Sequence, residues 1–134
     1  MIQLNYRDSK PIYEQIKEGL TRLLLTRAID TDEKLPSVRE LAEKLAINPN
    51  TIQRAYRELE AEGYIYTVPG KGSFAASREE VQRTRQRELW EDFDRTVSEL
   101  LLAGAGGEEL KKRIDTAEKK RAADGKNKEQ TGEE

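Results

Sequence analysis

Apolar residues recur at helical spacing near the start of the chain. From Pro11 onward they return every three or four positions, which predicts an amphipathic helix that ends near Arg27. The positions are Ile12, Ile16, Leu20, Leu23 and Leu24. Pro11 suits the first turn of a helix, because the N–H that proline lacks has no partner there. Before it, residues 2–5 alternate between apolar and polar and predict a short strand.

Two further helices are predicted by their start signals. Ser37 and Glu40 form a capping-box pattern, in which the serine accepts a bond from a helix amide and the glutamate reaches back. The apolar face of the short helix that follows is Val38, Leu41, Ala42 and Leu45. Asn48 is a favourable N-cap and Pro49 suits the first helical position, so a third helix is expected to begin there and to stop near Gly63. Its expected buried face is Ile52, Ala55, Tyr56 and Leu59.

A β-hairpin is predicted after the third helix. Residues 64–68 and 73–76 are rich in β-forming residues, and Pro-Gly-Lys-Gly at 69–72 supplies a turn between them. Residues 29–34 are mostly polar and turn-like. The fold class expected is therefore mainly α with a small β-hairpin wing, and residues 1–76 are expected to form a winged helix-turn-helix domain.

The rest of the chain predicts a helical tail. Ser77 and Glu80 repeat the capping-box pattern and open a long helix with an apolar stripe along one side. The stripe is formed by Trp90, Phe93, Val97, Leu100 and Leu101. A glycine-rich break at 103–107 separates this helix from a weaker one at 108–123. Residues 77–123 are thus expected to form a two-helix segment, and the polar, aperiodic residues 124–134 a disordered tail.

Composition narrows the class of protein. The chain of 134 residues contains neither cysteine nor histidine, which removes disulfides, thiolate metal sites and the commonest general base. No enzyme activity, metal or cofactor is therefore expected. Charged residues make up 37% of the chain and no apolar run is long enough to cross a bilayer, so a cytoplasmic protein away from membranes is expected. The net charge of −2 does not by itself indicate DNA binding, because what matters is where the charge lies.

Two short helices joined by a tight turn and followed by a hairpin are typical of a DNA-binding winged helix. In that arrangement the second helix of the pair enters the major groove. Asn50, Gln53, Arg54 and Arg57 face away from its buried side, and amide and guanidinium groups can pair with adenine and guanine. Lys71, between two glycines at the hairpin tip, can reach a phosphate or the minor groove. Each feature alone is more often an ordinary solvated surface; their order and spacing together favour DNA.

Four blocks in this order resemble the GntR family of bacterial regulators, over roughly residues 9–76. The blocks are Pro-Ile-Tyr-Glu-Gln-Ile (11–16), Leu-Pro-Ser-Val-Arg-Glu-Leu-Ala (35–42), Asn-Thr-Ile-Gln-Arg-Ala-Tyr-Arg-Glu-Leu-Glu-Ala-Glu-Gly (50–63) and Gly-Lys-Gly-Ser-Phe (70–74). The resemblance implies that Arg39 contacts DNA, that Asn50, Thr51 and Gln53 lie at the start of the recognition helix, and that Gly70 and Lys71 form the wing tip. Together with the residues above, the candidate DNA-binding set is Arg39, Asn48, Asn50, Thr51, Gln53, Arg54, Arg57, Gly70 and Lys71.

This chain departs from the common family pattern at two places. Many members have Ser-Arg where Asn48 and Pro49 stand, and many have arginine in place of Gln53. Neither arginine contact carries over, and a different operator preference follows. The Asn-Pro-Asn-Thr run instead resembles the YtrA-type branch, whose short two-helix tails serve dimerisation and whose genes often lie beside transporter genes. The resemblance therefore implies a homodimeric repressor that binds a pseudo-palindromic operator.

Three alternatives stay open at this point. The apolar stripe of the tail either forms an interface between two copies or folds back onto the winged helix of its own chain. The winged helix either binds DNA or binds a partner protein, although a protein-binding surface would favour apolar anchors over the polar residues seen here. An effector, if there is one, is a small molecule bound between protomers.

Overall fold

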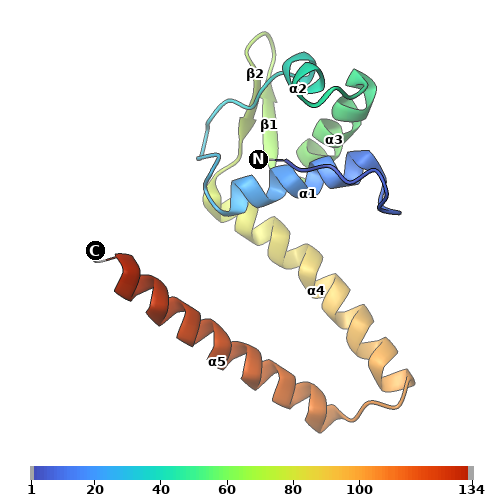
Figure 1. Ribbon diagram of the computed structural model, residues 1–134, viewed down its shortest axis with the longest axis vertical. Helices are drawn as coiled ribbons and strands as arrows, with labels where there is room; N and C mark the ends of the chain where they lie inside the picture. The colour runs from blue at the N-terminus through green and yellow to red at the C-terminus, as the bar shows by residue number, and fades with distance from the viewer. Residues whose placement is uncertain (1, 133–134) are drawn as a thin grey trace. The chain divides into compact units, whose positions relative to one another are not determined.

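The mainly helical chain with one hairpin that the sequence predicted is confirmed. The computed structural model describes the backbone of residues 2–132 and the side chains of residues 2–126. Within that part there are five helices and one antiparallel pair of strands (Figure 1). The chain divides after Glu88 into two units, each of which is described on its own below.

Helix α1 (Ile12–Leu25) begins where Pro11 predicted it. The backbone N–H groups of Glu14 and Gln15 both donate to the carbonyl of Pro11, at 3.1 and 3.2 Å. Its inner face buries Ile16, Leu20 and Leu24, three positions four residues apart. The helix ends two residues before the expected Arg27, which takes a positive φ of 65° and turns the chain away.

Helices α2 (Val38–Leu45) and α3 (Pro49–Glu62) form the expected helix-turn-helix. The hydroxyl of Ser37 accepts a bond from the backbone N–H of Glu40 at 3.0 Å and so caps α2. Ala46, at a left-handed φ of 56°, ends α2 and makes the turn to α3 tight. The far end of α3 is closed by Gly63 at a φ of 98°, a conformation that glycine adopts without steric cost.

The core of the first unit lies between α1, α3 and the hairpin. Ile16 of α1 meets a stripe of α3 that is fully buried, as predicted. The stripe is Ile52, Ala55, Tyr56 and Leu59. Burial of each large apolar side chain contributes about 1.5–3 kcal/mol, so this contact fixes the orientation of α3 and leaves its other face outside.

A third segment of the chain, residues 32–35, pairs with the hairpin, and the sequence did not reveal it. Strand β1 (Ile65–Val68) pairs with β2 (Gly72–Ala75) in antiparallel register, with Ile65 opposite Ala75. The other edge of β2 is hydrogen-bonded to residues 32–35, through Asp32 N–H to the Ala75 carbonyl and Leu35 N–H to the Ser73 carbonyl, each 2.9 Å. This segment was expected to be only a turn. Its backbone groups pair with β2, but its side chains do not alternate between apolar and polar, so the sequence gives no sign of a strand.

Helix α4 (Arg78–Leu102) starts at the second capping box, where the Ser77 hydroxyl accepts from the backbone N–H of Glu80 at 3.2 Å. Its first turns belong to the first unit, because Val81 and Thr84 are buried there and Thr84 donates to the carbonyl of Glu62. The winged-helix unit therefore reaches Glu88, beyond the expected boundary at residue 76.

The second unit consists of the rest of α4 and of α5 (Gly107–Gly132). The break between the helices lies where the glycines predicted it. Helix α5 continues through residues 124–132, where a disordered tail was expected; residues 133 and 134 lie outside the described part. In the part of the chain that the structure describes, no helix has the length and apolarity needed to cross a bilayer.

The predicted strand at residues 2–5 does not form. Instead this segment lies irregularly against α1, where Ile2 packs over Gly19 so closely that a Cβ at Gly19 would come within 3.0 Å of it. The side chain of Gln15 fixes the segment by accepting a bond from the Asn5 N–H at 2.8 Å and donating to the Asn5 carbonyl at 2.9 Å. These bonds replace the strand partner that residues 2–5 lack.

Candidate nucleic-acid interface

The N-terminus of α3 is built by Asn48 and Pro49. The side-chain oxygen of Asn48 accepts a hydrogen bond from the backbone N–H of Asn50 at 2.9 Å, and Pro49 occupies the first helical position. Both roles were predicted. Because the first turn of a helix carries a partial positive charge, this end of α3 favours a negatively charged partner.

The outward face of α3 is polar and basic. Asn50, Gln53 and Arg57 are exposed on it, and Thr51 is half-buried at its margin. The structure thus brings together the residues of α3 that the sequence selected, on the face opposite the buried stripe. Within residues 50–57 that face offers amide, hydroxyl and guanidinium groups and no large apolar side chain. Such groups are those that read base edges in the major groove.

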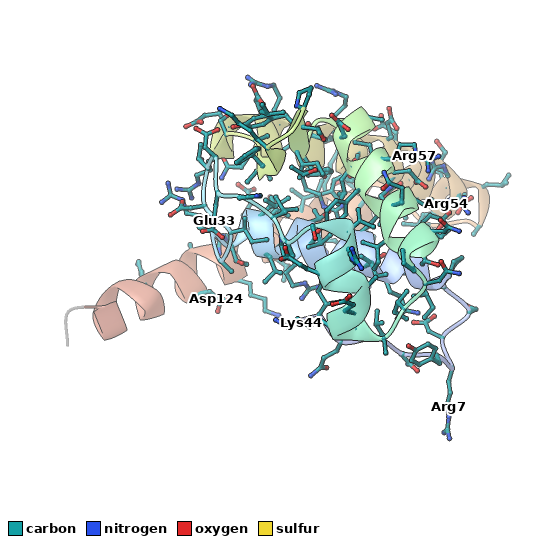
Figure 2. The ribbon with its side chains drawn as sticks, turned by 90° about the horizontal axis from the view of Figure 1, so that it is seen from above. Arg7, Glu33, Lys44, Arg54, Arg57 and Asp124 are labelled. Atoms are coloured by element: carbon teal, nitrogen blue, oxygen red, sulfur yellow. The ribbon has the colours of Figure 1, made fainter. Side chains whose placement is uncertain are left out.

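Arg54 and Arg57 project from α3 one turn apart but in different surroundings (Figure 2). Arg54 lies toward α1: its guanidinium carbon is 3.7 Å from the centre of the Tyr13 ring, and its Nε donates to Glu58 at 3.2 Å. Arg57 makes no hydrogen bond or ion pair with any residue that the structure describes. The sequence placed both arginines on one face and gave no sign of this difference.

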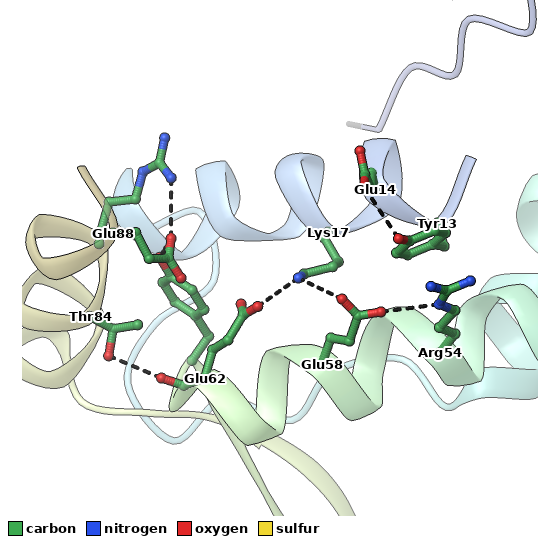
Figure 3. Close-up of polar contacts among 10 residues, drawn as sticks. Tyr13, Glu14, Lys17, Arg54, Glu58, Glu62, Thr84 and Glu88 are labelled. Atoms are coloured by element: carbon green, nitrogen blue, oxygen red, sulfur yellow. Dashed lines mark hydrogen bonds and ion pairs between the residues drawn. The ribbon is translucent and has the colours of Figure 1, made fainter. Parts of the chain in front are cut away.

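Glu58 belongs to a polar chain between α1 and α3 that the sequence did not indicate (Figure 3). Lys17 of α1 donates to Glu58 at 3.1 Å and to Glu62 at 2.7 Å. Burial alone would lower the pKa of Lys17, but these two bonds outweigh it and raise the pKa. The bond from Lys17, supported by the one from Arg54, lowers the pKa of Glu58, although partial burial opposes it. Both groups are therefore charged at neutral pH.

Arg39 lies on the outside of α2. Its side chain is 89% exposed and its Nε is 3.7 Å from Glu43, a distance at which solvent-exposed charges attract only weakly. Arg39 is therefore free to move to another anion. In Figure 1, helix α2, which carries Arg39, lies with α3 and the hairpin on the same side of α1.

The tip of the hairpin is a tight turn that presents Lys71. The Lys71 N–H donates to the carbonyl of Val68 at 3.0 Å, and Gly70 has a φ of 76°. Proline followed by a glycine at positive φ is the pattern of a type II turn. The Lys71 side chain is exposed. A second lysine was missed by the sequence analysis: Lys34 lies against Gly72, where a Cβ would come within 2.8 Å of its Cε.

Several acidic residues of the first unit line one groove beside α1. A groove of about 660 Å³ is bordered by α1, α3 and the first turns of α4. Five glutamates line it, accompanied by Lys17, Arg22 and Arg85: Glu14, Glu18, Glu58, Glu62 and Glu88. Part of the acidic charge in this nearly neutral chain therefore lies beside α1, away from the hairpin tip. Among the described residues, no acidic group is arranged to hold a metal ion.

Apolar side chains stay exposed in the second unit. Trp90 is 62% exposed and packs edge-on against Phe93, with ring centres 5.5 Å apart. Leu100 and Leu101 of the predicted stripe are also exposed, and Val97 is half-buried. Ile114 of α5 adds a further exposed apolar residue. Exposed apolar area of this extent, on one helix face, is typical of a surface that binds a partner.

Comparison with known sequences shows that the first unit is similar to bacterial transcription regulators. A sequence model of bacterial regulatory proteins, the gntR family, matches residues 12–75. The HTH-type transcriptional repressor YtrA of Bacillus subtilis is 50% identical over 74 residues, which are 55% of this chain and 57% of that repressor. The match thus spans little more than half of the repressor. The uncharacterized HTH-type transcriptional regulator YhcF of Bacillus subtilis is 38% identical over 115 residues, 83% of this chain and 93% of that protein.

Solved structures extend the similarity into the tail. A GntR family transcriptional regulator from Listeria monocytogenes superposes with a TM-score of 0.68 at 36% identity, covering 83% of this chain and 98% of that one. The structure of AraR(DBD) in complex with operator ORR3 has a TM-score of 0.50 at 31% identity and covers 55% of this chain and 89% of that one.

Proposed function

The chain belongs to the GntR family of bacterial regulatory proteins, and on that basis we propose that it is a sequence-specific DNA-binding transcription repressor. The observation that carries the proposal is the outward face of α3. Asn50, Gln53 and Arg57 stand exposed behind a capped N-terminus, on a helix whose other face is fixed in the core. A helix in that position enters the major groove with its first turns.

Two neighbouring elements support binding to a duplex. Lys71 at the hairpin tip and Arg39 on α2 offer exposed cations on the two elements that adjoin α3 in the chain. Cations in such positions contact phosphates and set the register of the protein on the duplex. The similarity to a repressor and to a DNA-binding domain held on its operator agrees with this arrangement.

We further propose that the protein is a homodimer held by the apolar stripe of α4. The stripe is exposed within the second unit, and two copies could bury it against each other around a two-fold axis. A two-fold dimer reads two half-sites of a pseudo-palindromic operator. A site of action in the cytoplasm follows from binding to the bacterial chromosome.

The regulated genes and the effector are further parts of this proposal. The resemblance to the YtrA-type branch makes transporter genes the first candidates. A small molecule bound between protomers would change the affinity for the operator. A regulator without an effector would respond to its own concentration alone.

The experiment that tests the proposed function is selection of genomic fragments by the full chain, followed by binding to the recovered duplex. We expect one sequence to be enriched. Gln53→Ala should weaken binding to that sequence by about 1–3 kcal/mol, because alanine lacks the amide group that would contact a base. Gln82→Ala, on the exposed surface of α4, is the matched control and should leave the affinity unchanged. If no sequence is enriched, or if binding is indifferent to salt, the ligand is not DNA.

A partner protein is the second candidate for the winged-helix surface. Its recognition would require apolar anchors, and the exposed face of α3 holds none among residues 50–57. Steep loss of binding with salt would favour DNA over such a partner, because counterions released from phosphates are the cause of that dependence.

A further inference from the structure

Arg54 is the one arginine of α3 whose side chain is held in place by other residues of the described chain. The face of its guanidinium lies over the ring of Tyr13, 3.7 Å from the ring centre, and its Nε is bonded to Glu58 at 3.2 Å. Tyr13 belongs to α1, which is packed against α3 through the core. One planar face and one edge of the guanidinium are thus fixed by groups on two helices.

The remaining edge of Arg54 is available to an anion. Its Nη1 and Nη2 make no hydrogen bond with the residues that the structure describes, and its side chain is 58% exposed. These two nitrogens form the end-on fork that binds two oxygens of a phosphate or carboxylate at once. Arg54 is therefore a pre-positioned anion-binding group.

The direction in which Arg54 is held indicates which anion it meets. A side chain that points straight out from a recognition helix faces the floor of the major groove, whereas one that points sideways faces the groove wall, which is lined by phosphates. Tyr13 and Glu58 hold Arg54 sideways, toward α1. Arg57, one turn further along, has no such restraint among the described residues and can extend toward the bases.

We propose that Arg54 binds a backbone phosphate at the edge of the groove and that Tyr13 and Glu58 are positioning residues that hold it there. This assignment rests on the proposed function. It replaces the base-reading role that the sequence predicted for Arg54, and it gives Tyr13 a function in DNA binding although that residue lies on α1. Tyr13 and Glu58 belong to the protein, so they hold Arg54 in the same place whatever the DNA sequence.

The charges beside Arg54 are compatible with a nearby phosphate. Glu58 would repel a phosphate if it were unpaired, but its second oxygen accepts from Lys17 at 3.1 Å, and Lys17 also pairs with Glu62 at 2.7 Å (Figure 3). The chain Arg54–Glu58–Lys17–Glu62 alternates in sign along its length. Its positive end, Arg54, is 58% exposed.

The test uses the full chain and two duplexes, the one that the wild type recovers from genomic fragments and a scrambled duplex of the same composition. Arg54→Gln should weaken binding to both duplexes by the same factor, about tenfold, because a charge-assisted phosphate bond is lost whatever the sequence. The slope of log affinity against log salt concentration should become shallower by about one unit. Arg57→Gln is the contrasting variant and should weaken binding to the recovered duplex far more than to the scrambled one.

Tyr13 is tested by paired substitutions. Tyr13→Phe keeps the ring face and should bind like the wild type, whereas Tyr13→Leu should lose about two- to fivefold on both duplexes, as expected for loss of an exposed cation–π contact. In the Arg54→Gln background, Tyr13→Leu should cause no further loss of DNA binding, because Tyr13 acts on the DNA through Arg54. Thermal unfolding of each variant checks that α1 still packs.

Different results test the proposed function and the assignment of Arg54 separately. If the wild type recovers no preferred duplex, the proposed function fails. If it does, but Arg54→Gln selectively weakens the recovered duplex, Arg54 reads a base and the phosphate assignment is wrong. If the losses from Tyr13→Leu and Arg54→Gln multiply, Tyr13 does not act through Arg54.

Discussion

The side-chain oxygen of Asn48 accepts the backbone N–H of Asn50 at 2.9 Å, and this bond closes the N-terminus of α3. The bond also limits what Asn48 can offer to DNA. Its oxygen is engaged by the helix, so that only its amide nitrogen remains to donate to a base or phosphate. Asn48 therefore combines a structural role with a candidate binding role, and the two can be separated by substitution.

Asn48→Ala should lower the free energy of unfolding by about 1 kcal/mol, because one amide of the first turn loses its partner. Asn48→Asp should keep the cap and the stability, since a carboxylate is favourable at a helix N-terminus. The same Asp should weaken DNA binding by placing a negative charge where a donor was. Urea denaturation and titration with the recovered duplex measure the two effects; equal stability of Asn48→Ala and the wild type would contradict the capping role.

Glu58 gives a prediction about pH. Its pKa in the folded protein lies below the ordinary value of 4.5, chiefly because of its bond from Lys17. Its contribution to stability is therefore complete above pH 4.5 and is lost as the pH falls through the lower, folded pKa. Because the pair is partly exposed, we expect Glu58→Gln to cost at most about 1 kcal/mol at pH 7 and nothing in more acidic solution. Denaturant unfolding of both proteins across this range tests it; a difference that grows toward low pH would have the wrong sign.

Gly70 in the wing turn and Gly106 in the break between α4 and α5 are expected to respond differently to alanine. Gly70 has a φ of 76° and open space around it, so Gly70→Ala should destabilise the first unit through backbone conformation alone, by about 1 kcal/mol. Gly106→Ala is the control, because Gly106 has neither a positive φ nor a neighbour within 4 Å. Thermal unfolding measures both. A neutral Gly70→Ala would mean that the turn does not need the left-handed conformation.

The apolar stripe predicts the oligomeric state. Light scattering should give twice the 15.4 kDa mass of one chain for the wild type at micromolar concentration. Phe93→Glu places a charge in the stripe and should yield the single-chain mass, with weaker operator binding because a monomer contacts one half-site. Leu102→Ser, at an exposed position on another side of α4, should remain dimeric. A wild-type monomer would remove the proposed role of the stripe.

Local signals in the sequence predicted the elements well. Pro11, Ser37, Asn48, Gly63 and Ser77 each act within a few residues of their own position, and each begins or ends a helix as expected. The outward face of α3 was also predictable, because it is the complement of an apolar stripe on one helix. The DNA contacts assigned to that face stay predictions.

What could not be predicted depends on residues far apart in the chain. Arg54 is held toward α1 by Tyr13, which lies on another helix. Residues 32–35 pair with β2 through backbone atoms, about forty residues further along the chain. The strand expected at residues 2–5 failed because no partner strand lies beside it, although Ile2 still packs onto α1. The length of α5 was underestimated because residues 124–132 carry no apolar periodicity.

The central claim is that the outward face of α3 recognises a DNA sequence. The most direct measurement is the affinity of the wild-type chain for its recovered duplex and for the scrambled duplex at one salt concentration. We predict a ratio of about a thousand or more, as specific regulators show. A ratio near one would contradict the account, even if both duplexes were bound tightly.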